Sequence, residues 1–595
     1  MKLQLTSTDN FYKDVSNLLL LGEWCVDIND KKNYNIAKNH YSNLEEVTKN
    51  SEFCYKVYDF FISKVSDKLN KLNNKNYSNR YWEILIGPWL WFYICVVYDR
   101  YKSLLTVSKK YKDLEVTIAD KNYVCSKFVD NYYLIQKHEY NYFIFSEIIK
   151  NYNFDFQINF HQSDNLVKYL NSFLLPKLSK KTKQRINYIY LLKKFIKIPF
   201  MVINFIKLKY AKSHNNFINI NMPVGLDKKL YRKLNQVFYQ EYRSIIIPNL
   251  YVKIDTKIRA EKIVSYKLDQ PFYELINNLL LNNIPIEYLE NYKLNSECIK
   301  HFIHKKIPRL IGVRSPCEFH SVLRFLTSEY SRLGAKILSC QEGGGQGARI
   351  INLMDEKIDS RFADLYLTWG WKSKEKNTIP FYFTKLFWLK KYKYNVNGSI
   401  IILGASCRNY FHSFNSGQLP IYNSTLIKMN VGLIKSVNKA VYKDLIYRFH
   451  WQFGYNEIEY IKKEFSNLKI STREKESHFY ELFFKSKLIV ITTDFTTIKQ
   501  AFVCNHPTIL LWDKNYFTVR DSAKKYYDEL NKVGILFYNY TDCANKINQI
   551  SNDPMKWWQT KEVQDAKNKY AEYFCKLSKD ISTDLAQTIK KNFLI

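Results

Sequence analysis

The sequence predicts an α/β fold built from parallel, doubly wound sheets. In the second half of the 595-residue chain, short apolar runs alternate with segments of helical periodicity, which is the pattern of βαβ units. Near the start, residues 18–24 form an apolar run that meets a glycine, as expected of a buried parallel strand that leads into a loop. Between residue 40 and about residue 300, Tyr, Leu, Ile and Lys recur at helical spacing.

The strands expected in the second half follow in order, with a helical segment between most neighbours. They are residues 307–313, 335–340, 363–370, 398–406, 443–449, 486–494, 506–512 and 533–539. Helices between such strands cover both faces of a parallel sheet, and ligands bind at the carboxyl ends of the strands. We therefore expect the functional residues in the segments that follow these strands.

The chain divides into two expected domains and a C-terminal helix. A Lys-rich segment at 385–395 has the composition of a hinge, so residues 1–390 form the first domain, with a large helical and basic insertion at about 100–300. Residues 396–565 form a second doubly wound domain. Residues 566–595 are expected to form a helix that packs back on the first domain.

Composition favours a globular protein of the cytoplasm. Hydrophobic residues make up 46% of the chain, which excludes wholesale disorder. The longest apolar run, 84–97, contains Gly-Pro and is shorter than the roughly 18–20 residues that span a bilayer, and the N-terminus lacks the features of a signal peptide. The 11 Cys and 11 His are scattered, so we expect reduced thiols and no metal site.

Charge is the first informative anomaly, because 90 Lys and Arg stand against 56 Asp and Glu. Between Asp164 and Asp227 no acid interrupts twelve basic residues, and an apolar, basic stretch lies between Lys177 and Lys212. Such a stretch fits docking on an anionic membrane surface, or alternatively a core-facing helix pair with a basic rim. No nucleic-acid-binding motif accompanies the charge, so nucleic acid is not an expected partner.

The segments at the ends of four expected strands carry groups suited to binding an anion. Residues 341–347 form a glycine-rich turn, in which backbone amides approach a ligand closely. Hydroxyls at 492–497 precede a helix, where they either cap it or bind phosphate. Arg408, Arg448 and His450 follow two further strands and suit a nucleotide phosphate without a metal.

Several motifs resemble those of transferases encoded in bacterial O-antigen and surface-polysaccharide gene clusters. The second half is also similar in layout to the glycerophosphotransferases that polymerise teichoic acid and to two-domain glycosyltransferases. The resemblance therefore implies a GT-B-like arrangement of two Rossmann-like domains that face a cleft. It rests on the segments 21–25, 81–90 with Asp99-Arg100, 341–347, 363–371 and 492–497 with Pro507-Thr508.

The resemblance also implies roles for individual residues. The first domain would hold the acceptor, and the second would hold the nucleotide of the donor. The implied donor-binding residues are Gln341, Gly343, Gly344, Gly345, Arg408, Arg448, His450, Thr493, Asp494, Thr496 and Thr497. Because the related loops carry His where this chain has Glu342, either Glu342 or Glu23 is the candidate catalytic base, provided that the reaction inverts. The Glu342 replacement equally fits a different donor or a non-catalytic member.

These implications lead to a specific functional hypothesis. We expect a cytoplasmic glycosyltransferase that moves a sugar onto a surface-polysaccharide acceptor, free or lipid-linked, without a metal or other cofactor. An acidic sugar on CMP is the favoured donor. Two alternatives stay open: a CDP-polyol phosphotransferase of the teichoic-acid type, and a non-catalytic protein that docks on membrane or glycan at the inner face of the cytoplasmic membrane.

Overall fold

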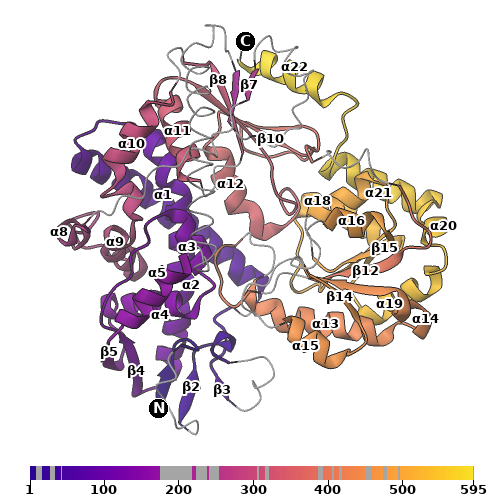
Figure 1. Ribbon diagram of the computed structural model, residues 1–595, viewed down its shortest axis with the longest axis horizontal. Coiled ribbons are helices and arrows are strands. Elements are labelled where there is room, and N and C mark those ends of the chain that lie inside the picture. The colour runs from indigo at the N-terminus through magenta and orange to yellow at the C-terminus, as the bar shows by residue number, and fades with distance from the viewer. Residues whose placement is uncertain are drawn as a thin grey trace, which may run out of the picture.

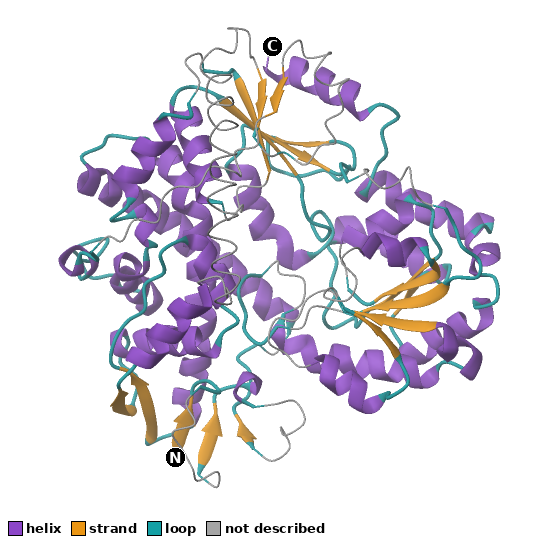
Figure 2. Cartoon of the chain, in the orientation of Figure 1, coloured by secondary structure: helices purple, strands orange, loops and turns teal. Residues whose placement is uncertain are grey.

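The computed structural model describes most of the chain and contains three parallel sheets, each with helices around it (Figures 1 and 2). The α/β class and the doubly wound parallel sheets are confirmed, and there is one sheet more than expected. The described residues are 1–8, 17–26, 34–41, 43–174, 217–220, 222, 237–239, 253–303, 307–314, 320–385, 393–404, 408–414, 419–449, 457–472, 479–493 and 496–593.

The first sheet lies nearest the N-terminus and has the order β3-β2-β1-β4-β5 (Figure 1). Its central strand pairs with two strands from distant parts of the sequence, because Leu3 lies opposite both Leu19 and Val116. The five strands are β1 (Lys2–Gln4), β2 (Leu18–Leu20), β3 (Asn35–Ile36), β4 (Leu114–Ala119) and β5 (Phe156–His161).

Long helices pack between the first sheet and the second. The longest, α2 (Asn79–Lys110), has the length and composition of a membrane-spanning helix, but 94% of its most apolar window is buried inside the protein, as in a core helix. Ser78 caps it by accepting a hydrogen bond from the backbone N–H of Tyr81. The other helices here are α1 (Leu44–Asn73), α3 (Phe128–Leu134), α4 (His138–Asn151), α5 (Asp164–Leu174), α8 (Thr256–Arg259), α9 (Pro271–Asn283) and α10 (Tyr292–Lys300).

The second sheet has the order β11-β10-β9-β8-β6-β7. Alternate residues of its strands enter two cores, as expected where both faces are covered. Ile337 packs with the long helices, and Leu338 packs with Leu585 of the C-terminal helix α22 (Ile581–Phe593). The elements are β6 (Phe217–Asn219), β7 (Val237–Tyr239), β8 (Leu310–Arg314), α11 (Ser321–Arg332), β9 (Lys336–Cys340), α12 (Leu353–Arg361), β10 (Leu365–Thr368) and β11 (Thr378–Pro380).

The third sheet has the order β14-β13-β12-β15-β16-β17 and is also buried on both faces. Its strands are β12 (Ser399–Leu403), β13 (Leu445–Arg448), β14 (Lys469–Ser471), β15 (Ser486–Ile491), β16 (Thr508–Leu511) and β17 (Leu536–Phe537). Its helices are α13 (Asn423–Ser436), α14 (Lys439–Asp444), α15 (Glu457–Glu464), α16 (Phe479–Phe484), α17 (Thr496–Val503), α18 (Asp521–Lys532), α19 (Tyr540–Ile550), α20 (Pro554–Trp558) and α21 (Lys561–Phe574). Each of the eight apolar runs predicted in the second half overlaps a strand, whereas β11 and β14 were not predicted.

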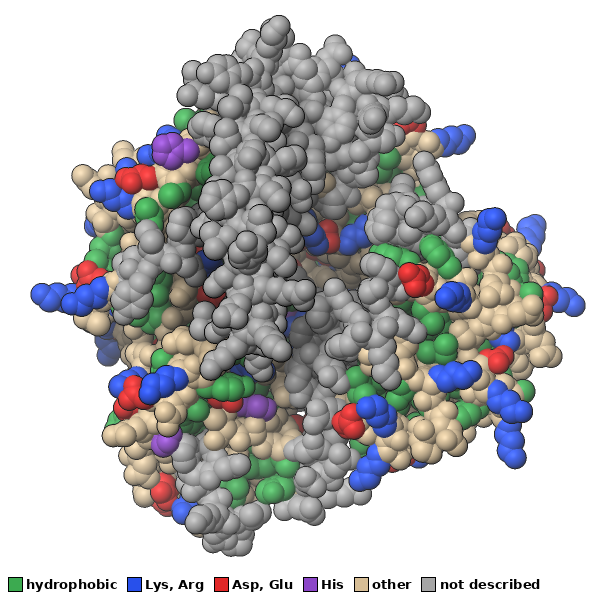
Figure 3. All heavy atoms as spheres, viewed as in Figure 1, with side chains coloured by type: hydrophobic (Ala, Val, Ile, Leu, Met, Phe, Trp, Pro, Cys, Tyr) green, Lys and Arg blue, Asp and Glu red, His purple; other side chains and the backbone are tan. Residues whose placement is uncertain are grey.

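Basic side chains are dispersed over the face that Figure 3 shows, with acidic side chains between them. The basic stretch between Lys177 and Lys212 lies outside the described residues, so membrane docking through it stays a prediction. The nine described cysteines are free.

Candidate functional site between the second and third sheets

The glycine-rich loop after β9 is held by its first residue, Gln341. The side-chain Oε1 of Gln341 accepts hydrogen bonds from the backbone N–H of Trp369 (2.9 Å) and the indole N–H of Trp371 (2.8 Å). Its Nε2 donates to the carbonyl of Gly343 (2.7 Å). Gln341 and both tryptophans are buried, so these three side chains shape the loop instead of facing solvent.

The glycines of this loop have different surroundings. A Cβ added to Gly343 would meet no described residue within 4 Å, whereas one added to Gly345 would come within 2.9 Å of the Asn352 amide. Gly347 has a φ of +78°, which favours glycine, and its N–H donates to the Glu356 carboxylate (2.8 Å). Gly343 therefore leaves open space at the end of the sheet, while Gly345 and Gly347 allow the chain to turn closely.

Glu342 is paired with two cations, one at the end of β8 and one in the segment that follows β11. Its Oε1 contacts the Arg314 guanidinium, at the end of β8, and the Lys385 ammonium at 2.9 Å, beyond β11. Its Oε2 is shielded from solvent and has no hydrogen-bond partner among the described residues. One oxygen of the candidate base is thus neutralised by two cations, and the other has no hydrogen-bond partner in the part of the chain that the structure describes.

Helix α17 of the third sheet meets the glycine loop directly. The buried Lys499 side chain donates to the carbonyl of Gly344. The helix begins at Thr496, and Thr496 and Thr497 are both partly exposed, whereas Thr493 is buried. Because the helix dipole favours anions at its N-terminus, the arrangement places two hydroxyls and a positive helix end beside the loop. Asp494 lies outside the described residues.

Helix α12 connects the glycine loop to the rest of the molecule through three acids. Glu356 accepts from the Gly347 N–H and pairs with Arg520. Asp359 accepts from the Gln346 amide (2.8 Å). Asp355 accepts from the indole N–H of Trp91 (2.8 Å) on α2, and burial raises the pKa of this carboxyl to about 8. The loop is therefore anchored from both sides.

Arg448 and Arg408 lie at the ends of β13 and after β12, and both are buried. Arg448 donates to the Ser471 hydroxyl (2.6 Å) and to the Thr472 carbonyl (2.8 Å), which ties it to the end of β14. The pKa of Arg408 is lowered by burial, and Tyr132 of α3 lies beside it. His450 lies outside the described residues.

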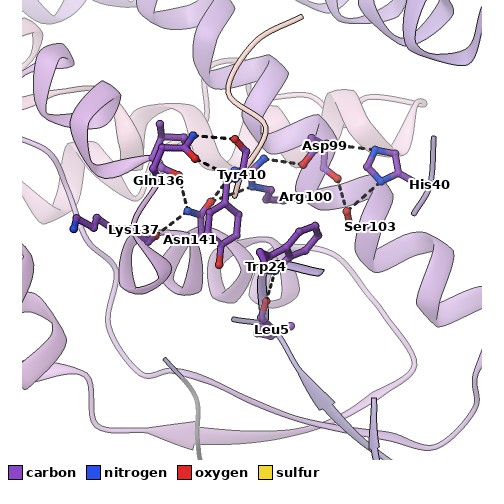
Figure 4. A network of polar contacts seen from close by, with 11 residues as sticks. Leu5, Trp24, His40, Asp99, Arg100, Ser103, Gln136, Lys137, Asn141 and Tyr410 are labelled. Atoms are coloured by element: carbon purple, nitrogen blue, oxygen red, sulfur yellow. Dashed lines mark hydrogen bonds and ion pairs between the residues drawn. The ribbon is translucent and has the colours of Figure 1, made fainter. Parts of the chain in front are cut away.

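A buried polar network forms where the segment after β12 meets the end of the first sheet (Figure 4). The Arg100 guanidinium pairs with Asp99 (2.7 Å), donates twice to Asn141 (2.7 and 3.1 Å) and lies 5.3 Å from the ring centroid of Tyr410. The Tyr410 hydroxyl contacts Nδ1 of His138 (2.8 Å). Tyr410 lies in the segment that follows β12 of the third sheet. This network therefore joins the N-terminal helices to the third sheet.

The candidate base Glu23 lies near this network and not beside the glycine loop. It is exposed, at the start of a short 3-10 helix (Glu23–Cys25). Its neighbour Trp24 donates to the Leu5 carbonyl (2.9 Å) and packs against the Tyr410 ring. Glu23 thus lies after β2 at the end of the first sheet, and Glu342 lies after β9 at the end of the second.

The structure brings part of the predicted site into direct contact. Lys499 joins α17, which begins with Thr496 and Thr497, to the glycine loop that carries Glu342, while Arg408 lies beside Tyr132 of α3 and Arg448 is bonded to the end of β14. Three residues of the assembled site were not predicted: Arg314, Lys385 and Lys499. The position of Arg314 at the end of an expected strand was a usable signal. Among the described residues, no group of three His, Cys, Asp or Glu could hold a metal ion.

Comparison with known proteins gives a family and several distant structural similarities. The model of the LIC12162 family transferases matches residues 1–589. No curated protein matches the chain. The solved structures that match include TarM (TM-score 0.31, 11% identity, 51% of this chain), Anabaena HepE with UDP-glucose (0.32, 11%, 64%) and the wall teichoic acid polymerase TagF with CDPG (0.30, 9%, 68%). The matches cover 58% of TarM, 100% of HepE and 98% of TagF, so the chain spans less than two thirds of TarM.

Proposed function

Because the chain belongs to the LIC12162 family of transferases, we propose that it transfers a sugar from a nucleotide-activated donor to a bacterial surface-polysaccharide acceptor. The donor binds where the glycine loop of the second sheet meets the N-terminus of α17. The observation that carries this proposal is the direct contact between Lys499 and Gly344, since it joins the ligand-binding ends of two parallel sheets.

The chemistry of the assembled groups supports an anionic donor. Thr496 and Thr497 offer hydroxyls at a helix N-terminus, and the space at Gly343 lets a ligand reach the loop backbone. Arg314 and Lys385 add two cations beside Glu342. These groups stabilise negative charge that develops on a leaving phosphate, and the free oxygen of Glu342 accepts the proton of the acceptor hydroxyl. An acidic sugar on CMP is the donor we favour, and the cytoplasm is the compartment.

A thermal-shift experiment tests the proposal. The melting temperature of the full chain is measured with CMP, CDP, UDP, GDP and ADP in turn, because a ligand at 100 times its Kd adds roughly 2.7 kcal/mol to the stability of the native state. We expect one nucleotide to stabilise the protein selectively, and the shift to shrink in Thr497→Val. A matched control is Thr541→Val, at an exposed position in the first turn of α19.

The protein is then incubated with donors that carry the stabilising nucleotide, and the product that forms defines the reaction. Transfer of a sugar adds no phosphorus to the acceptor, whereas transfer of a polyol phosphate does, so the product mass separates the two chemistries. Stabilisation by none of the nucleotides would contradict the proposed function.

A further inference from the structure

A small cavity lies beside the second sheet, away from the contact between the glycine loop and α17. Its volume is about 20 Å³, which exceeds the roughly 10–15 Å³ that one water needs. It lies between α2, β8, α11, β9 and the residues before β10. The side chains around it include Ile84, Arg314, Arg324, Thr327, Ser339 and Phe362.

Arg324 forms no direct ion pair with a carboxylate that the structure describes, and the nearby Glu287 lies beyond the Tyr288 hydroxyl. The residue is 3% exposed, and its Nε and Nη1 have no hydrogen-bond partner among the described residues. Its Nη2 donates to the Tyr288 hydroxyl (2.7 Å), and its guanidinium carbon lies 4.6 Å from the ring centroid of Phe128. Arg324 is thus held in place by a hydroxyl and an aromatic ring, while two of its nitrogens keep their donor capacity.

Another residue that lines the cavity offers a further donor. Ser339 of β9 is 1% exposed, and its hydroxyl also has no partner in the described part of the chain. Buried donors are normally satisfied, and a buried cation without a counter-charge is unfavourable. An unpartnered guanidinium and an unpartnered hydroxyl that line one cavity therefore point to an anionic ligand.

We infer that this cavity binds a compact oxyanion, a phosphate or a carboxylate, between Arg324 and Ser339. Arg314 links the cavity to the candidate site, because it lines the cavity and pairs with Glu342. The oxyanion bound here is an acidic group of the acceptor, which places the rest of that molecule toward Glu342. The assignment to the acceptor rests on the proposed function, but the anion site itself does not.

The experiment compares the response of the melting temperature to inorganic phosphate and to acetate in full-length variants. We expect the compact oxyanion to stabilise the wild-type protein in a saturable manner, and Arg324→Gln to abolish the saturable part. Arg332→Gln is the matched control, because Arg332 lies on the same helix, is more exposed and pairs with Glu329. Stabilisation by phosphate alone identifies a phosphate site, and stabilisation by acetate alone identifies a carboxylate site.

Two further measurements keep the test decisive. If Arg324→Gln does not fold, Ser339→Ala is used instead. We expect Ser339→Ala to lower the affinity for the anion about fivefold, as the loss of one hydrogen bond would. In crystals grown with selenate, an anomalous peak beside Arg324 and Ser339 is expected. The inference would be overturned if phosphate or acetate shifted the melting temperature equally in the wild type, Arg324→Gln and Ser339→Ala. It would also be overturned if the cavity held no selenate. Failure of the nucleotide experiment, in contrast, leaves the phosphate shift intact.

Discussion

The buried ammonium of Lys499 donates a hydrogen bond to the carbonyl of Gly344, and so α17 of the third sheet holds the glycine loop of the second. Lys499 also lies 3.4 Å from the Tyr570 hydroxyl and close to the rings of Tyr570 and Phe574. A lysine in such surroundings keeps its position because the carbonyl and the rings replace water around its charge. Lys499 therefore helps to set the relative position of the two sheet ends, together with the Arg520–Glu356 pair and the backbone bridge between Arg349 and Val519.

Replacement of Lys499 by Met tests this dependence. Methionine keeps most of the volume but leaves the Gly344 carbonyl without its partner, so we expect kcat/KM for the donor to fall at least about tenfold, which is about 1.4 kcal/mol. The melting temperature falls as well. Steady-state kinetics and thermal unfolding measure the two effects, and Lys569→Met, which removes an exposed lysine paired with Glu529, is the control. Unchanged donor kinetics would show that the contact does not position the loop.

Glu342→Gln separates a catalytic role from a structural one. If Glu342 accepts the acceptor's proton, the amide lowers kcat by about 10²–10⁴-fold and leaves stabilisation by the nucleotide intact, because general-base catalysis contributes that much. If Glu342 only neutralises Arg314 and Lys385, turnover stays near the wild-type value. Glu375→Gln, at an exposed position beyond β10, provides the control for the kinetics.

Eight of the ten strands from β8 to β17 were predictable because they lie in short apolar runs bounded by turn residues, whereas the edge strands β11 and β14 are more exposed and were not predicted. Ile400 and Ile402 enter one core, and Ile401 enters the other, so the whole run is apolar and stands out in the sequence. The carboxyl ends of these strands could then be identified, and with them the glycine loop and the start of α17.

The first sheet as a whole was not predictable in the same way. Its central strand, β1, has only three residues and pairs with β4, more than one hundred residues later, through contacts that no local pattern encodes. The roles of Gln341 and Arg448 were also not predictable. Only the fold brings Trp371 into contact with Gln341 and Ser471 into contact with Arg448. Residue types suggest ligand contacts, but the neighbours that satisfy them come from distant segments.

The ion pair of Arg100 with Asp99 predicts a strong effect on stability. Arg100 is fully buried, so Arg100→Met leaves the buried Asp99 carboxyl with His40, at 3.5 Å, as its remaining ion-pair partner among the described residues. We expect the free energy of unfolding to fall by about 3–5 kcal/mol. The double variant Asp99→Asn, Arg100→Met should recover part of this loss, because no charge is left unpaired.

Urea unfolding of the two single variants and the double variant measures the coupling between these side chains. Lys435→Met, which breaks an exposed pair with Glu464, serves as the control and should leave the midpoint unchanged. Additive effects of the two buried substitutions would contradict a coupled pair.

Burial of Asp355 makes the stability of the protein fall as the pH rises. Its pKa is raised from 3.8 to about 8 by burial first and by the nearby Asp359 and Glu356 second, against the hydrogen bond from Trp91. Between these two pH values the native state keeps a proton that the unfolded chain has lost. The contribution to stability is therefore fully present below about pH 4 and is lost as the pH rises toward about 8.

The variant Asp355→Asn removes this titration while its amide oxygen still accepts from Trp91. We expect it to raise the melting temperature at about pH 8.5, to change it little at about pH 4, and to flatten the profile between them. The profile will not become level, because burial also raises the pKa of Glu147 to about 7 and of Asp130 to about 6. Thermal unfolding across this range, with exposed Asp269→Asn as the control, measures the slope. A variant whose profile parallels that of the wild type would show that Asp355 does not keep its proton in the native state.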